Sequence, residues 1–159
     1  MARRSATRTK PKATSRGVPV NHLRAALSIL GITVVALTLI PLQWFSVRFD
    51  IGDKAYLPRL FHRAVRRIVG FKIIQTGTIS PDRPLLFAIN HSSWLDITVF
   101  GSLTPVAYVA KQEVATWPVF GLFARLQRTV FIERTRQRTA GHRDDMLQRL
   151  DAGERIGLF

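Results

Sequence analysis

The longest apolar run in the chain covers residues 25–47, with the sequence AALSILGITVVALTLIPLQWFSV. These 23 residues carry no formal charge. As a helix they would measure roughly 34 Å, which is enough to cross the hydrocarbon core of a bilayer. The run is too long for the apolar part of a signal peptide. We therefore predict an uncleaved membrane-anchoring helix over residues 22–48, and not a buried core helix.

Basic residues flank this segment on both sides, so charge gives it no orientation. Residues 1–24 hold seven Lys or Arg and no acid, and residues 48–72 hold seven more. The positive-inside rule needs an asymmetry that is absent here. A helix that bends at Gly31 or Pro41 and returns, or one that lies at a single face, would keep both flanks in the cytoplasm. The sequence is therefore compatible with a helix that spans the membrane and with one that enters and leaves on the same side.

Residues 56–71, YLPRLFHRAVRRIVGF, place apolar residues at helical spacing. The apolar stripe consists of Leu60, Phe61, Ala64, Val65, Ile68 and Val69. Four arginines occupy the rest of the helix surface. Within the segment 49–70 this pattern predicts an amphipathic helix that packs on the domain, lies on the bilayer, or does both.

From residue 71 onward, short apolar runs alternate with helical patterns. Strand-like runs lie at 71–76, 85–90, 106–111, 129–134 and 154–159. Helical patterns lie at 92–103, 118–126 and 139–151. The alternation predicts an α/β domain over residues 71–159, with a mostly parallel sheet and flanking helices, preceded by the N-terminal membrane helix.

Composition narrows the class of protein. The 159-residue chain fits one domain, and its lack of cysteine excludes disulfides and thiolate metal sites. Its net charge is +14, and the basic, Ser/Thr-rich stretch 1–21 contributes strongly to it. Such a stretch cannot bury a core, so we predict a disordered tail that suits nucleic acid or anionic lipids. The adjoining apolar segment favours membrane lipids over a nucleic-acid partner.

Polar residues follow the predicted strand 85–90 in the stretch NHSSWLDI. Ligands of parallel sheets bind beyond the carboxyl ends of the strands, where His91 would lie. Ser93-x-x-Asp96 fits a helix capping box, in which the carboxylate accepts backbone amides. The same placement lets Asp96 reach His91, fix its tautomer and make it a general base. Taken alone, the pair favours the capping role.

The sequence offers no nucleophile to accompany such a base. It has no cysteine and no Gly-x-Ser-x-Gly turn. A His–Asp pair without a protein nucleophile suits direct attack by a bound hydroxyl group. The catalytic interpretation therefore implies a substrate that brings its own hydroxyl.

A second polar cluster lies in RTVFIERTRQR, at residues 128–138. Its four arginines form either an exposed basic loop or a clamp for phosphate, because an arginine fork binds two phosphate oxygens at once. Lys111, at the end of another predicted strand, would add positive charge.

Three stretches together resemble a known family. His91-Ser-Ser-Trp-Leu-Asp96 resembles the His-x4-Asp motif of the glycerolipid acyltransferases. VFIER, at 130–134, resembles their second motif, and AKQEVATWPVFG, at 110–121, resembles the segment between the two. In this order, after a membrane anchor, the stretches are similar to bacterial 1-acylglycerol-3-phosphate acyltransferases and their lysophospholipid relatives.

The resemblance implies a reaction and a site. An acyl chain would move from acyl carrier protein or coenzyme A to the free hydroxyl of a lysophospholipid. The expected acceptor is 1-acyl-sn-glycerol-3-phosphate, which gives phosphatidic acid. His91 would be the base and Asp96 its orienting partner. The acceptor would be bound by Arg134, Phe131, Glu133 and Lys111.

The resemblance also sets the surroundings of the reaction. No metal or organic cofactor is expected, because the acyl thioester is a co-substrate. The expected partners are membrane lipids, the lipid acceptor and the thioester donor, without nucleic acid. The expected location is a bacterial inner membrane, with the catalytic domain on the cytoplasmic face.

The chain departs from the family at two points. Arg128 stands where the second motif usually has Gly, which makes a lyso-ornithine lipid a credible alternative acceptor. The third motif, Glu-Gly-Thr, normally follows a strand like RIGLF, and the chain stops there at Phe159. We therefore expect a domain that is incomplete at its C-terminus, belonging either to a longer enzyme or to an inactive, truncated membrane protein.

Overall fold

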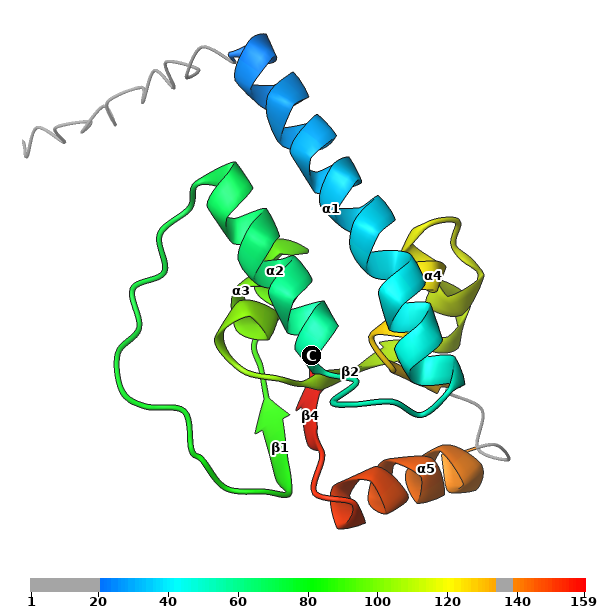
Figure 1. The fold of residues 1–159 in the computed structure, drawn as a ribbon. Coiled ribbons are helices and arrows are strands. Elements are labelled where there is room, and N and C mark those ends of the chain that lie inside the picture. Colours follow the sequence, from blue (N-terminus) through cyan, green and yellow to red (C-terminus); the bar gives the residue numbers. More distant parts are fainter. Residues whose placement is uncertain (1–20, 134–138) are drawn as a thin grey trace, which may run out of the picture.

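A computed structural model of the chain describes residues 21–133 and 139–159. The helices are α1 His22–Arg48, α2 Tyr56–Val69, α3 Leu95–Leu103, α4 Phe120–Leu126 and α5 Thr139–Asp151, with a 3₁₀ turn, η1, at Gln112–Thr116. The strands are β1 Leu85–Ala88, β2 Ala107–Lys111, β3 Val130–Ile132 and β4 Arg155–Leu158. Figure 1 shows a small α/β unit from which the N-terminal half of α1 projects.

The four strands form one parallel sheet in the order β1-β4-β2-β3. β4 is the last strand in the chain, yet it lies inside the sheet, with β1 on one side and β2 on the other. Each parallel neighbour must be reached by a crossover, and helices supply most of these connections. The predicted α/β class with a mostly parallel sheet and flanking helices is confirmed.

The core forms where the β4-β2-β3 side of the sheet meets the helices. Ile156 in β4 and Val130 in β3 are the most completely buried of the larger side chains described, and Ala107 and Tyr108 of β2 are also buried. Gly157 lets its neighbours approach closely, because a Cβ there would lie 3.1 Å from side-chain carbons of Ile89 and Tyr108. Apolar residues follow one another along the inner strands because both faces of the sheet are covered.

The prediction of a strand at residues 71–76 is wrong. Residues 71–84 contain no helix or strand, and Ile74 is 93% exposed. An apolar run becomes a strand when a neighbouring strand satisfies its backbone, and within the described residues β1 pairs with β4 alone. Two helix boundaries also differ, because α3 begins at Leu95 and the predicted helix 118–126 shortens to α4.

The predicted apolar helix forms over its full length. α1 runs without a break past Gly31 and Pro41, so neither residue makes it turn back. Its length and hydropathy are sufficient to cross a membrane, and most of its surface is free of protein contacts. Gln43 connects the C-terminal half of α1 to the α/β unit. Its side-chain amide donates to the carbonyls of Lys54 and Leu126, each at 2.8 Å.

α2 packs beside α1, and Arg59 near its start donates to the Leu103 carbonyl at the end of α3 at 2.8 Å. Ile68 contacts α1 at Gly31, and Arg24 of α1 donates to the Val69 carbonyl at 3.4 Å. Val65 is buried, whereas Arg63 and Arg67 are exposed. The predicted amphipathic helix is confirmed as a helix packed on the domain, and its contact with a bilayer stays a prediction.

His62 of α2 is pressed against α3. The side chain is 6% exposed, and burial lowers its pKa to about 4, although a hydrogen bond with Gln127 opposes the shift. The neutral ring therefore packs like an apolar group. A Cβ at Gly101 of α3 would lie 2.5 Å from His62 Cδ2, so this contact requires glycine.

We expect Gly101→Ala to lower the free energy of unfolding by about 1–3 kcal/mol, because the added methyl group overpacks the contact with His62. Chemical denaturation of the purified protein in detergent measures the loss. Gly31→Ala is the control, since its Cβ would lie 3.5 Å from Ile68 Cδ1, an ordinary contact. An equal loss in both variants would contradict this account of the packing.

Candidate active site

His91 and Asp96 come together beyond the carboxyl end of β1. Their Nδ1 and Oδ2 atoms lie 3.2 Å apart. β1 ends at Ala88 and α3 begins at Leu95, so the short connection carries His91 and the first turn of the helix carries Asp96. The predicted juxtaposition of imidazole and carboxylate is therefore present in the structure.

The same carboxylate oxygen also caps the start of α3. Asp96 Oδ2 accepts hydrogen bonds from the backbone amides of Ser92, at 2.7 Å, and Ser93, at 2.8 Å. The Ser93 hydroxyl in turn accepts from the Leu95 amide at 3.3 Å. The contacts expected from a capping residue and those expected from a partner of His91 thus occur together.

These contacts set the charge of the pair. The backbone amides of Ser93 and Ser92 hold the pKa of Asp96 below its usual range, and the nearby His91 adds to the effect. Asp96 is therefore ionised at neutral pH and can only accept hydrogen bonds. In the neutral imidazole the proton therefore lies on Nδ1, facing Asp96, and Nε2 keeps a lone pair.

Aromatic rings support the imidazole from one side. The ring centroids of His91 and Phe159 lie 4.4 Å apart, and those of Phe159 and Tyr108 lie 5.1 Å apart. Tyr108 is buried and donates its hydroxyl to the Ile97 carbonyl at 2.9 Å, and its burial raises the pKa of the phenol. The His91 side chain stays 41% exposed, so a substrate can reach it.

The other predicted binding residues lie on the same edge of the sheet but farther along it. Lys111 ends β2, and its Nζ lies 2.6 Å from Glu113 Oε1. Phe131 is in β3, and Glu133 follows it. Three strand spacings of about 4.8 Å separate β1 from β3, so the ends of these two strands stand about 14 Å apart along the edge. Arg134 lies outside the described residues.

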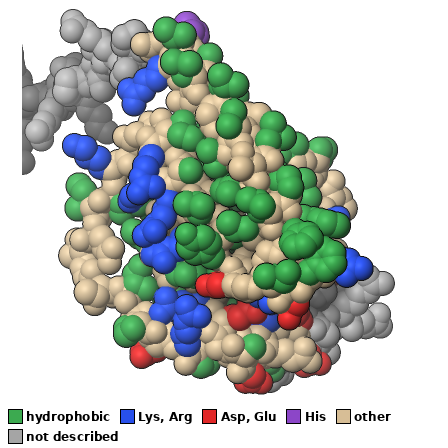
Figure 2. All heavy atoms as spheres, in the orientation of Figure 1, with side chains coloured by type: hydrophobic (Ala, Val, Ile, Leu, Met, Phe, Trp, Pro, Cys, Tyr) green, Lys and Arg blue, Asp and Glu red, His purple; other side chains and the backbone are tan. Residues whose placement is uncertain are grey.

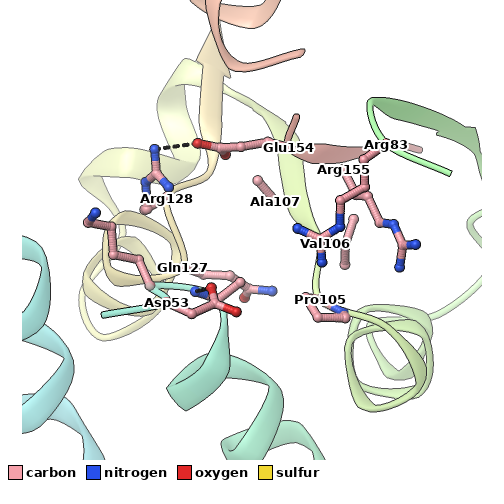
Figure 3. Close-up of a pocket in the computed structure, with 11 residues that line it drawn as sticks. Asp53, Arg83, Pro105, Val106, Ala107, Gln127, Arg128, Glu154 and Arg155 are labelled. Carbon is pink, nitrogen blue, oxygen red and sulfur yellow. Dashed lines mark hydrogen bonds and ion pairs between the residues drawn. The ribbon is translucent and has the colours of Figure 1, made fainter. Parts of the chain in front are cut away.

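A cavity of about 70 Å³ opens at the opposite edge of the sheet, shown in Figure 3. Its lining residues include Arg83, Arg128 and Arg155, which all lie at or before the start of a strand. Arg128 Nη2 pairs with Glu154 Oε1 at 2.6 Å. Arg155 donates to Thr104 Oγ1 at 2.7 Å and to nearby backbone carbonyls. The cavity is a structural polar cluster remote from His91.

Arg128 therefore does not lie where it could contact an acceptor bound at His91. It lies at the amino edge, whereas His91 and Asp96 lie at the carboxyl edge. Its φ angle is +59°, a left-handed conformation that glycine adopts most easily. The usual glycine of the resembled motif thus has a backbone explanation, and Arg128 gives no information on the headgroup.

The capping box predicted from Ser93-x-x-Asp96 is present, because the Ser93 amide donates to Asp96. Sequence reasoning missed two other contributors to the site. Ser92 acts through its backbone amide, which no side chain signals. Phe159 reaches His91 because β4 pairs with β1 and the Ile89 amide donates to the Leu158 carbonyl at 2.8 Å. No group of three His, Asp or Glu side chains suited to a metal ion occurs within residues 21–133 and 139–159.

Comparison with known proteins supports the motif assignment. The profile of the family named Acyltransferase matches residues 70–159, which include all four strands and the His91–Asp96 pair. The lyso-ornithine lipid O-acyltransferase of Rhizobium meliloti (strain 1021) is 41% identical over 141 residues, covering 88% of this chain and 48% of the relative. The lyso-ornithine lipid O-acyltransferase of Brucella abortus (strain 2308) is also 41% identical, covering 88% of this chain and 53% of the relative.

A different acyltransferase matches a smaller part of the chain. The 1-acyl-sn-glycerol-3-phosphate acyltransferase of Neisseria gonorrhoeae is 40% identical over 67 residues, covering 41% of this chain and 26% of the relative. No solved structure matches significantly. The chain spans about half the length of the first two relatives. Because the family profile covers more than half of its residues, this chain belongs to the Acyltransferase family.

Proposed function

We propose that this chain carries the catalytic base of an O-acyltransferase that acts on a lyso-ornithine lipid. The His91–Asp96 pair is the observation that supports the chemistry, because it supplies a base without a protein nucleophile. The 41% identity over 88% of the chain to lyso-ornithine lipid O-acyltransferases supports the acceptor.

The proposed reaction needs one base and one acid, and His91 serves as both. The acceptor hydroxyl attacks the thioester carbonyl carbon while Nε2 of His91 takes its proton. A C–O bond forms and the C–S bond breaks. The departing thiolate takes the proton from the imidazolium, which restores the neutral base. Asp96 holds the Nδ1 proton and stabilises the imidazolium while it exists.

The charges along the carboxyl edge are consistent with this acceptor. An ornithine headgroup carries a carboxylate and an ammonium group, whereas a glycerol phosphate carries negative charge alone. Lys111, Glu113 and Glu133 place both signs of charge along this edge. A zwitterionic headgroup suits mixed charges better than a phosphate dianion does. Acyl transfer to 1-acyl-sn-glycerol-3-phosphate is the competing function, supported by the shorter match to the Neisseria enzyme.

The proposal includes a location. α1 anchors the chain in a membrane, so that the insoluble acceptor reaches the site without leaving the lipid phase. Segment 49–70, with α2, links this anchor to the acyltransferase domain 71–159, and the basic tail 1–21 adds attraction to anionic lipids. The donor is an acyl thioester of acyl carrier protein or coenzyme A, delivered from the cytoplasm. No resident metal or organic cofactor takes part.

Membranes that carry the chain should esterify lyso-ornithine lipid with a labelled acyl thioester, and His91→Ala should lower the rate about 10²–10⁴-fold, because it removes the general base. Product formation is measured by chromatography of the extracted lipids. His22→Ala, an exposed histidine at the start of α1, is the control and should keep the wild-type rate. Equal rates for His91→Ala and the wild type would refute the assignment of His91 as the general base.

The same assay separates the two acceptors. Lyso-ornithine lipid should be consumed faster than 1-acyl-sn-glycerol-3-phosphate at equal concentration. Faster consumption of the phosphate lipid, with the His91→Ala loss intact, would overturn the acceptor and keep the acyltransferase mechanism.

Asp96 should also contribute an acid-sensitive part of the folding stability. Its folded-state pKa lies below the usual value of 3.8, so the contribution is present above that value and is lost as the pH falls through the folded pKa. Asp96→Asn should therefore reduce stability at neutral pH and flatten the acid end of the profile. Chemical denaturation at a series of pH values measures both effects.

Asp144→Asn, in an exposed part of α5, is the control for the pH profile. It should follow the wild-type curve. An Asp96→Asn curve with the same slope as the wild type below pH 4 would contradict the assigned contacts with the Ser92 and Ser93 amides.

A further inference from the structure

The loop between η1 and α4, together with the first turn of α4, gathers apolar side chains on the surface; we call these residues, 117–122, the 117–122 loop. Trp117, Val119, Phe120 and Leu122 are 55%, 63%, 66% and 47% exposed. The sequence from 114 to 124 contains no charged residue. Exposed apolar side chains are ordinary when scattered, but a contiguous group on one loop marks a binding surface.

The loop is held in this form by its own backbone. The Gly121 amide donates to the Trp117 carbonyl at 2.9 Å, and a Cβ at Gly121 would lie 2.5 Å from the Ala115 carbonyl oxygen. Arg125 Nη2 also donates to that oxygen at 2.9 Å. Val119 has a φ angle of +63°, which a β-branched residue rarely adopts. The turn is thus fixed, with Trp117 and Phe120 facing solvent.

The loop belongs to the part of the molecule that lies beside α1. α4 contacts α1, and Gln43 of α1 donates to the Leu126 carbonyl at the end of α4. Figure 1 shows α4 next to the lower half of α1. On α1 itself, Leu42, Trp44 and Phe45 are each at least half exposed. The loop and the apolar surface of α1 therefore come from adjacent elements.

We infer that residues 117–122 form a second membrane contact, which inserts into the interface of the bilayer that holds α1. The inference rests on the proposed anchoring by α1. Tryptophan and phenylalanine beside aliphatic residues are the side chains that settle at the level of lipid headgroups. The partner of this surface is a bilayer that contains anionic lipid. Exposed basic residues of α2 and the following loop, Arg63, Arg67 and Lys72, attract its negative headgroups.

The surface of the molecule agrees with this arrangement. Figure 2 shows hydrophobic side chains along α1, while lysines and arginines gather to the side, over α2 and the loop after it. A single helix leaves the attached domain free to rotate about the helix axis. A second contact at 117–122 removes that rotation, so the carboxyl edge with His91 keeps one orientation to the lipid phase.

Quenching of tryptophan fluorescence by brominated lipids tests the inference. The chain has three tryptophans, so Trp44→Phe with Trp94→Phe leaves Trp117 as the one emitter. The full chain is reconstituted in vesicles of phosphatidylcholine and phosphatidylglycerol, brominated either near the headgroup or near the methyl end of the acyl chains. Circular dichroism checks that each variant is folded.

Two further variants complete the experiment. Trp94→Phe with Trp117→Phe leaves Trp44 and reports on α1. All three Trp→Phe changes together with Leu147→Trp place the emitter on α5, where Leu147 is 41% exposed and belongs to neither proposed contact. This variant is the matched control for an exposed tryptophan in water.

We expect Trp117 to lose most of its emission in vesicles brominated near the headgroup, with less loss near the methyl end, while the Leu147→Trp variant is unaffected. Quenching of Trp44 without quenching of Trp117 overturns the second contact and leaves the anchor intact. Quenching of neither residue overturns both the anchor and the loop contact. Quenching of all three emitters alike also overturns the inference, since the loop would then be no different from the control surface.

Discussion

Asp96 Oδ2 receives the backbone amides of Ser92 and Ser93 and lies 3.2 Å from His91 Nδ1. This one oxygen starts α3, shapes the turn after β1 and fixes the imidazole. If the carboxylate were protonated, the amides would keep only a weaker, uncharged acceptor and His91 would lose the charge that selects its tautomer. The local fold and the proposed base therefore depend on the same negative charge.

The strand order sets what else can join the site. β4 lies between β1 and β2, so it brings Phe159 against His91, while Glu133 follows β3, the strand three positions away from β1. A substrate that touches both ends of this edge must be extended, as a lipid with a headgroup and an acyl chain is. At the amino edge, Arg128 and Arg155 are engaged with Glu154 and Thr104, and they stabilise the turns there.

Periodicity predicted most of the fold, because its signals are local. The charge-free run marked α1, and the strands after residue 80 follow buried apolar runs that needed no knowledge of their neighbours. Segment 71–76 has the same apolar character but no strand beside it in the described chain, and pairing is a property that no short stretch reveals. The His91–Asp96 contact was predictable from spacing, since both residues bracket one helix start.

The remaining features of the site depend on long-range pairing or on backbone atoms. The contact between Phe159 and His91 requires the β1–β4 register, and the Ser92 amide has no side-chain signature, whereas the Ser93 amide was predicted from the capping box. The alternative acceptor that Arg128 suggested is the one the relatives favour, although Arg128 itself precedes β3 and lies at the amino edge, away from His91. Family motifs pointed to acyl transfer, whereas the proposed acceptor rests on relatives that align along 88% of the chain.

The central claim is that Asp96 holds the proton on Nδ1 of His91 and so leaves Nε2 free to accept one. Nitrogen NMR of protein labelled at histidine measures this tautomer directly, with His91→Ala used to assign the signal. The account predicts that neutral His91 carries its proton on Nδ1, and that Asp96→Asn weakens this preference. A neutral His91 with its proton on Nε2 would contradict the account, because that nitrogen could not take the proton of an acceptor hydroxyl.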